Sequence, residues 1–82
     1  MPTILRFDGL RVTVYPNDHR PAHVHVIGDG REAVFDLNCP DGPPVLRENF
    51  GFVSRQVNWI AKRLSAELAT LCGEWRRFHG DP

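Results

Sequence analysis

The stretch HVHVIGDGREAVFDL, residues 23–37, decides the fold. It contains two runs in which apolar residues alternate with polar ones, separated by the dipeptide Asp29-Gly30. Alternation is typical of a strand with one buried face, and Asp-Gly favours a type I′ turn, in which both central residues have positive φ. The stretch therefore predicts a β-hairpin in which His23 lies opposite Asp36.

A second hairpin is predicted upstream, where Asp8-Gly9 separates two further alternating runs. Its expected register pairs Phe7 with Leu10 at the turn and Thr3 with Val14 at the open end. A slip of one residue would mix apolar and polar side chains on each face, so the pattern favours this register. The apolar face then collects Leu5, Phe7, Leu10, Val12, Val14, Val24, Val26, Ala33, Phe35 and Leu37.

The remainder of the chain is predicted to be a loop over residues 39–51, which contain three prolines, and a long amphipathic helix over residues 52–79. Apolar residues recur in the helical segment at steps of three and four, which makes one stripe. Gly73 costs about 1 kcal/mol relative to alanine in a helix, so we expect the helix to bend or break there. The stripe consists of Val53, Val57, Ile60, Leu64, Leu68, Leu71, Trp75 and Phe78.

These elements predict one α+β domain spanning residues 1–82. Residues 1–38 are expected to form a four-stranded antiparallel sheet, and the helix is expected to pack on its apolar face. The apolar stripe of so long a helix is also compatible with a homodimer.

Composition excludes several classes of function. The chain has 10 basic and 10 acidic residues, so bulk charge does not favour polyanion binding. No apolar run approaches the ~18 residues that a membrane helix needs, and the first residues do not have the pattern of a secretory leader. Cys39 and Cys72 form no CxxC motif and are predicted to be free thiols. We therefore expect a cytoplasmic protein without a membrane partner.

The polar face of the sheet carries the residues of chemical interest. Three of the four histidines, His19, His23 and His25, lie close together in the sequence. If the middle strands pair, a row across the sheet reads Tyr15, His23 and Asp36, with opposed Cβ atoms ~5 Å apart. That distance allows an imidazole to bond a carboxylate.

Three interpretations of this cluster stay open. The histidines can be a solvated polar face, paired at most with Asp36. They can carry out metal-independent acid–base cleavage of RNA, with His23 as general acid or base, Asp36 orienting it, and His25 or His19 as the second proton carrier beside Tyr15. The candidate phosphate contacts are Arg6, Arg11 and Arg20.

The third interpretation is a metal site. His19, His23 and His25, with Asp36 or Glu32 as an oxygen ligand, offer the donors that zinc or another divalent transition metal binds. The His-x-His spacing is weakly specific, and the acid–base interpretation needs no cofactor.

The segments MPTILRF, HRPAHVHV, EAVFDL, VLRENFGFVSRQVNWI and EWRRFHG follow one another in an order that resembles a family of small bacterial proteins, the domain of unknown function 4160 family. The resemblance covers nearly the whole chain. Its most specific part is the pattern of His19, Pro21, His23 and His25. Ala22 stands where members often have a second proline.

The resemblance implies a protein partner. Members of the family are often encoded beside a second small family, domain of unknown function 2442, in an arrangement similar to a toxin–antitoxin pair. We therefore expect the toxin-like component of a two-protein module, with an antitoxin-like partner and ribonuclease-like action on RNA. The alternative from another class is a non-catalytic protein-binding module.

Overall fold

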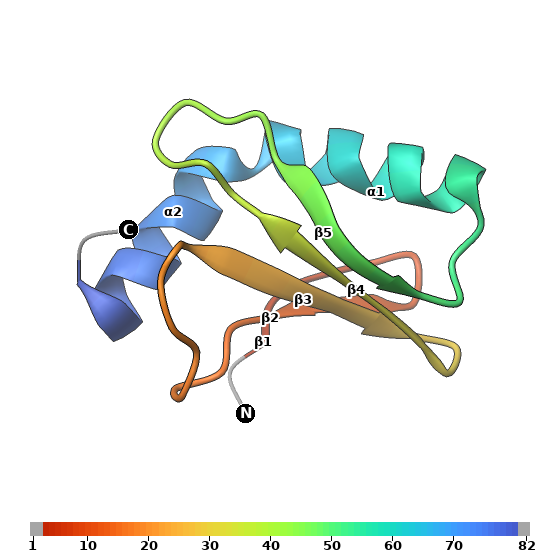
Figure 1. The fold of residues 1–82 in the computed structure, drawn as a ribbon, viewed down its shortest axis with the longest axis horizontal. Helices are drawn as coiled ribbons and strands as arrows, with labels where there is room; N and C mark the ends of the chain where they lie inside the picture. The colour runs from red at the N-terminus through yellow and green to blue at the C-terminus, as the bar shows by residue number, and fades with distance from the viewer. Residues whose placement is uncertain (1–2, 81–82) are drawn as a thin grey trace.

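The computed structural model describes residues 3–80, which form an antiparallel sheet of five strands and two helices (Figure 1). Residues 1–2 and 81–82 of the predicted domain lie outside the described range. Each strand pairs with the next along the chain. The strands are β1 (Thr3–Phe7), β2 (Leu10–Thr13), β3 (His23–Gly28), β4 (Arg31–Asp36) and β5 (Val45–Phe50), and the helices are α1 (Ser54–Ala66) and α2 (Leu68–His79).

The β3–β4 hairpin has the predicted register, from His23 opposite Asp36 to Gly28 opposite Arg31. Asp29 and Gly30 have φ values of 52° and 71°, as a type I′ turn requires. This hairpin fixes which side chains of β3 face the core.

The β1–β2 hairpin follows the predicted register only near its turn. Phe7 lies opposite Leu10, but the register shifts between Thr3 and Leu5, and Thr3 lies opposite Thr13 instead of Val14. A bulge of this kind adds one residue to an edge strand and increases its twist, which alternation alone does not reveal.

The prediction of a loop throughout residues 39–51 is wrong, because β5 occupies the second half of that segment and adds a fifth strand to the predicted four. The three prolines all precede Val45 and leave the strand free to pair with β4. Every residue of β5 is exposed, so the edge strand carries no burial pattern that sequence could show. Arg47 is the extra residue of a bulge against Val34 and Phe35.

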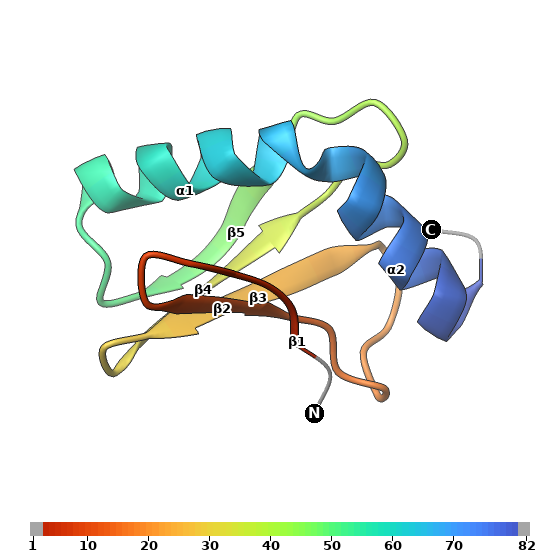
Figure 2. The same cartoon turned by 180° about the vertical axis from the view of Figure 1, so that it is seen from behind.

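The predicted single helix is also divided, but at Glu67 and not at Gly73. Glu67 has φ −110° and ψ 17°, and both helices end or begin beside it. Figures 1 and 2 show the result: α1 runs along the sheet, and α2 turns down past the end where β3 begins. Gly73 continues α2 because tertiary packing outweighs its small local cost.

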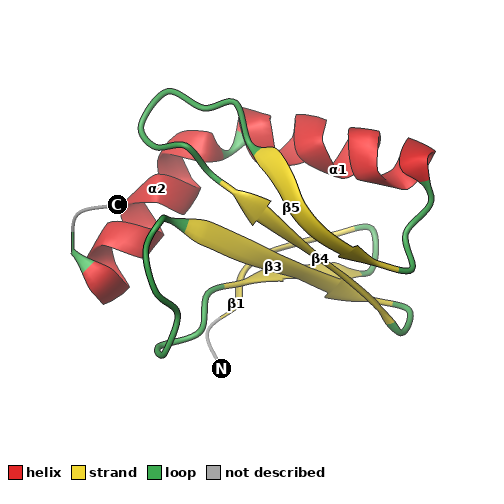
Figure 3. Cartoon of the chain, viewed as in Figure 1, coloured by secondary structure: helices red, strands yellow, loops and turns green. Residues whose placement is uncertain are grey.

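The core lies between the sheet and both helices, which occupy the same side of it (Figure 3). All ten residues of the predicted apolar sheet face belong to this core or pack against it, as the alternation predicted. The helices contribute the fully buried side chains of Ile60, Leu64, Leu71 and Trp75.

The two cysteines form a disulfide, which corrects the prediction of free thiols. Cys39 follows β4 and Cys72 lies in α2, 33 positions further on, with Cα atoms 5.8 Å apart. The spacing of Cys39 and Cys72 in the sequence does not predict this bond, because only the folded topology brings the two residues together. The bond ties the loop before β5 to α2. No helix among residues 3–80 has the length and apolar character needed to span a bilayer.

Replacing both cysteines by serine should lower the free energy of unfolding by about 3–4 kcal/mol, because a cross-link over a loop of this length restricts the unfolded chain. Denaturant unfolding under oxidising conditions measures the loss. In excess dithiothreitol the wild-type protein and the variant should differ far less. Two alkylatable thiols in the denatured, unreduced protein would contradict the bond.

Gly73→Ala should stabilise the protein by about 0.4–1 kcal/mol, because the glycine is exposed within α2 and an added Cβ meets no atom within 4 Å. Gly9→Ala is the matched control. Gly9 has φ +80°, so alanine there should destabilise the hairpin turn. Thermal unfolding measures both changes, and a destabilised Gly73→Ala protein would argue against a continuous α2.

Candidate functional site

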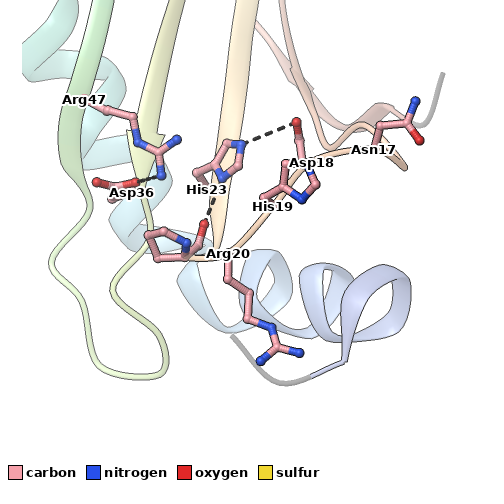
Figure 4. A pocket seen from close by; sticks show the side chains of 8 residues that line it. Asn17, Asp18, His19, Arg20, His23, Asp36 and Arg47 are labelled. Carbon is pink, nitrogen blue, oxygen red and sulfur yellow. Dashed lines mark hydrogen bonds and ion pairs between the residues drawn. The ribbon is translucent and has the colours of Figure 1, made fainter.

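The histidine cluster lies at the start of β3, where the loop after β2 enters the sheet (Figure 4). His23 is buried, and its Nδ1–H donates a hydrogen bond of 2.8 Å to the carbonyl oxygen of Pro21. A carbonyl can only accept, so this contact fixes the proton on Nδ1. The other nitrogen, Nε2, lies 3.4 Å from Oδ1 of Asp18.

The predicted His23–Asp36 contact does not form. The two residues are opposite one another in the β3–β4 ladder, as predicted. The carboxylate of Asp36 forms an ion pair with Arg47 of β5, and Figure 4 shows this pair on one side of His23 and Asp18 on the other. Asp36 pairs with Arg47 and not with His23, because β5 lies beside β4 and brings the Arg47 guanidinium next to the carboxylate.

Asp18 is the centre of the cluster, and the sequence prediction missed it. Its carboxylate lies 3.3 Å from Nε2 of His25 as well as near His23. The turn from Tyr15 to Asp18 holds it there: the backbone N–H of Tyr15 donates to Oδ2 of Asp18, and the N–H of Asp18 donates to the Tyr15 carbonyl. Aspartate side chains can accept a hydrogen bond from a backbone N–H three residues earlier, and this local pattern is the signal in the sequence that points to Asp18.

His25 lies between two carboxylates. Its Nδ1 is 3.0 Å from Oε2 of Glu32, on the neighbouring strand, while its Nε2 faces Asp18. The imidazole can donate to both carboxylates only when both nitrogens carry protons. Thr13 lies opposite His25 in the β2–β3 ladder, as the predicted pairing of these strands required.

Tyr15 contacts His25, not His23 as predicted, with ring centroids 4.6 Å apart in an edge-to-face arrangement. Burial raises the pKa of the Tyr15 hydroxyl above its usual 10.0, and the negative charge of Glu32 adds to the rise. The hydroxyl therefore stays protonated at neutral pH and can donate a hydrogen bond, but cannot act as a base.

Helix α2 also reaches the cluster, which sequence reasoning did not anticipate. The centroid of the buried Trp75 ring lies 5.2 Å from that of His23, and the centroid of the His79 ring lies 4.2 Å from that of Trp75. The ring of His79 donates through Nε2 to the carbonyl oxygen of Tyr15. The end of α2 thus braces both His23 and the turn that carries Asp18.

A pocket of about 460 Å³ opens beside His23 (Figure 4). Of the predicted candidates, His19, Arg20, His23 and Asp36 contribute to its wall. Arg6 and Arg11 lie opposite one another in β1 and β2 and do not line it. The complete lining is Asn17, Asp18, His19, Arg20, Pro21, His23, Asp36 and Arg47.

Arg47 also lines the pocket, and the prediction of a loop over residues 39–51 did not place it there. Its guanidinium is held at the pocket by Asp36, whereas the side chain of Arg20 extends away from both in Figure 4. Near a histidine whose tautomer is set by the backbone, the pocket wall therefore has one cation held by an ion pair, Arg47, and a second, Arg20, whose side chain extends away from that pair.

These features define a class: a small two-layer α+β domain with a carboxylate–histidine cluster at one end of its sheet. The family model described as domain of unknown function (DUF4160) matches residues 9–76, and the chain belongs to this family. The match confirms the resemblance predicted from the sequence. No curated protein and no solved structure matches the chain.

Replacing Asp18 by Asn should shift the ring NMR signals of both His23 and His25 strongly, because Asp18 faces the Nε2 atoms of both. Asp36→Asn, the matched control, should perturb His23 much less, since Arg47 is its partner. Proton–nitrogen spectra of the histidine rings measure both effects. A larger shift at His23 in Asp36→Asn would contradict this geometry.

Proposed function

We propose that the protein is the toxin-like component of a two-protein module and cleaves RNA without a metal ion in the pocket beside His23. The observation that carries this proposal is that two histidines, His19 and His23, and two arginines, Arg20 and Arg47, line one pocket. Arginines bind phosphate through several donors, and histidines exchange protons near neutral pH.

His23 is the proposed general base. Its proton on Nδ1 is held by the Pro21 carbonyl, so Nε2 is the atom that can accept a proton. In the proposed reaction the ribose 2′-hydroxyl gives its proton to Nε2 as the 2′-oxygen attacks phosphorus. The bond from phosphorus to the 5′-oxygen breaks, leaving a 2′,3′-cyclic phosphate and a 5′-hydroxyl.

His19 is the better candidate for the second proton carrier. His25 has carboxylates beside both of its nitrogens, whereas His19 is exposed in the pocket wall and can protonate the leaving 5′-oxygen. Arg47 would stabilise the charge on the phosphate. Asp36 acts through Arg47 and is a positioning residue.

The proposal includes an antitoxin-like protein partner and a cytoplasmic location, where the RNA is found. Exposed apolar side chains support the partner: Val45 and Phe50 of β5 and the adjoining Val53 are 51%, 57% and 61% exposed. A sheet edge with such side chains is a site where another protein can add contacts. The disulfide argues in the other direction, since such bonds are rare in the cytosol.

The same edge favours a second candidate function, a non-catalytic protein-binding module. In that case the histidine cluster stabilises the end of the sheet and binds no substrate. The two functions differ in what removal of a pocket histidine does, because only an enzyme loses turnover.

His19→Ala and His23→Gln should each reduce cleavage of a mixed-sequence single-stranded RNA by about 10²–10⁴-fold, the usual contribution of a proton-transferring side chain. Cleavage should continue in EDTA. Arg6→Ala is the control, since Arg6 is exposed and lies outside the pocket. Gel analysis measures cleavage, and circular dichroism shows that each variant is folded.

Full activity in both histidine variants, or no cleavage by the wild-type protein above a mock preparation, would overturn the enzyme proposal. The binding module would then be preferred.

A further inference from the structure

We propose that Asp18, His23 and His25 form a binding site for a divalent transition-metal ion, with Zn²⁺ as the probe of choice. One carboxylate oxygen and one nitrogen from each histidine lie within 4.8 Å of one another. The inference goes beyond RNA cleavage and does not rest on it, because it concerns binding in the absence of any substrate.

The distances from the Asp18 carboxylate to the two histidine Nε2 atoms fit a metal ion. Zinc bonds of about 2.0–2.1 Å in a tetrahedron put neighbouring ligand atoms about 3.3–3.4 Å apart. The Asp18 carboxylate lies 3.4 Å from Nε2 of His23 and 3.3 Å from Nε2 of His25. Charge-assisted hydrogen bonds are shorter, about 2.7–2.9 Å, so both contacts are long for a direct ion pair and match the spacing of two ligands on one ion.

The outer contacts of the two histidines are a second, independent observation. A histidine that binds metal through one nitrogen commonly donates from the other to a carbonyl or carboxylate, which fixes its tautomer and orientation. His23 donates through Nδ1 to the Pro21 carbonyl, and His25 bonds Glu32 through Nδ1. Both rings are therefore oriented with Nε2 toward the same carboxylate, Asp18.

Burial and charge also favour a cation at this position. The side chains of Asp18, His23 and His25 are only 13%, 6% and 14% exposed, so water screens the cluster weakly. Asp18 and Glu32 supply two negative charges, and the nearby Arg47 is balanced by Asp36. Because Asp18 and His23 line the pocket, an ion can enter there and a water molecule can complete the coordination.

This ligand set differs from the one that the sequence predicted. His19 lies in the pocket wall but is not among the three residues whose donor atoms converge. Asp18 replaces it, because the turn that begins at Tyr15 aims the aspartate at both histidine rings. The neighbouring positions 18 and 19 therefore provide a test and its control.

Isothermal titration of the metal-free, full-length protein with Zn²⁺ tests the site, with spectra of bound Co²⁺ as a second readout. We expect one ion per chain. Asp18→Asn and His25→Gln should each weaken binding by about 100-fold or more, and Glu32→Gln, which removes only an outer contact, by about 10-fold. His19→Gln should bind within about two-fold of the wild-type protein.

No saturable binding, or equal loss in His19→Gln and His25→Gln, would overturn the proposal. Should His25→Gln fail to fold, Glu32→Gln decides the matter, because Glu32 is more exposed and unaltered binding in that variant contradicts the outer contact. Histidine-independent binding would identify an adventitious ion.

The same titration separates this inference from the proposed RNA cleavage. The ion would take Nε2 of His23, which is the proposed base, so stoichiometric Zn²⁺ should stop cleavage if both proposals hold. If the protein binds Zn²⁺ but does not cleave RNA in EDTA, the metal site is supported and the nuclease proposal is overturned. If the protein cleaves RNA but does not bind Zn²⁺, the nuclease proposal is supported and the metal site is overturned.

Discussion

The register of the β3–β4 hairpin is the constraint on which the rest of the structure depends. Asp29 and Gly30 adopt positive φ, and the two-residue turn then fixes every pair up to His23 opposite Asp36. Because side chains alternate, Val24 and Val26 enter the core while His23 and His25 share the opposite face. A shift of one residue would bury the imidazoles in the apolar core, so the turn determines both the core and the histidine cluster.

Local patterns predicted the parts of the fold that local interactions determine. The two Asp-Gly turns, the apolar sheet face and the apolar stripe of the helices can be read from neighbouring residues. Three features that arise from tertiary contacts were missed. The exposed edge strand β5 has no burial pattern, the helix breaks where α2 must pass the sheet end, and the disulfide joins residues 33 positions apart.

The errors at the site follow from the error in the fold. A loop over residues 39–51 gives Arg47 no predicted position and leaves Asp36 free to bond His23. In the structure Asp36 forms an ion pair with Arg47, and Asp18, in the turn before β3, lies beside the Nε2 atoms of both His23 and His25. The cluster itself was predictable because alternation puts His23 and His25 on one face. Its carboxylate was not, because a loop residue reaches the sheet only through the turn geometry.

The proposed cleavage and the proposed metal site both require His23 to carry its proton on Nδ1 and to have an unprotonated Nε2, the nitrogen that faces Asp18 in the pocket wall. Nitrogen-15 NMR of the histidine rings at pH ~8.5, well above the ordinary histidine pKa of ~6.5, tests this requirement most directly. The account predicts the Nδ1–H tautomer for His23, held by the Pro21 carbonyl. A proton on Nε2, or rapid exchange between the two tautomers, would contradict it.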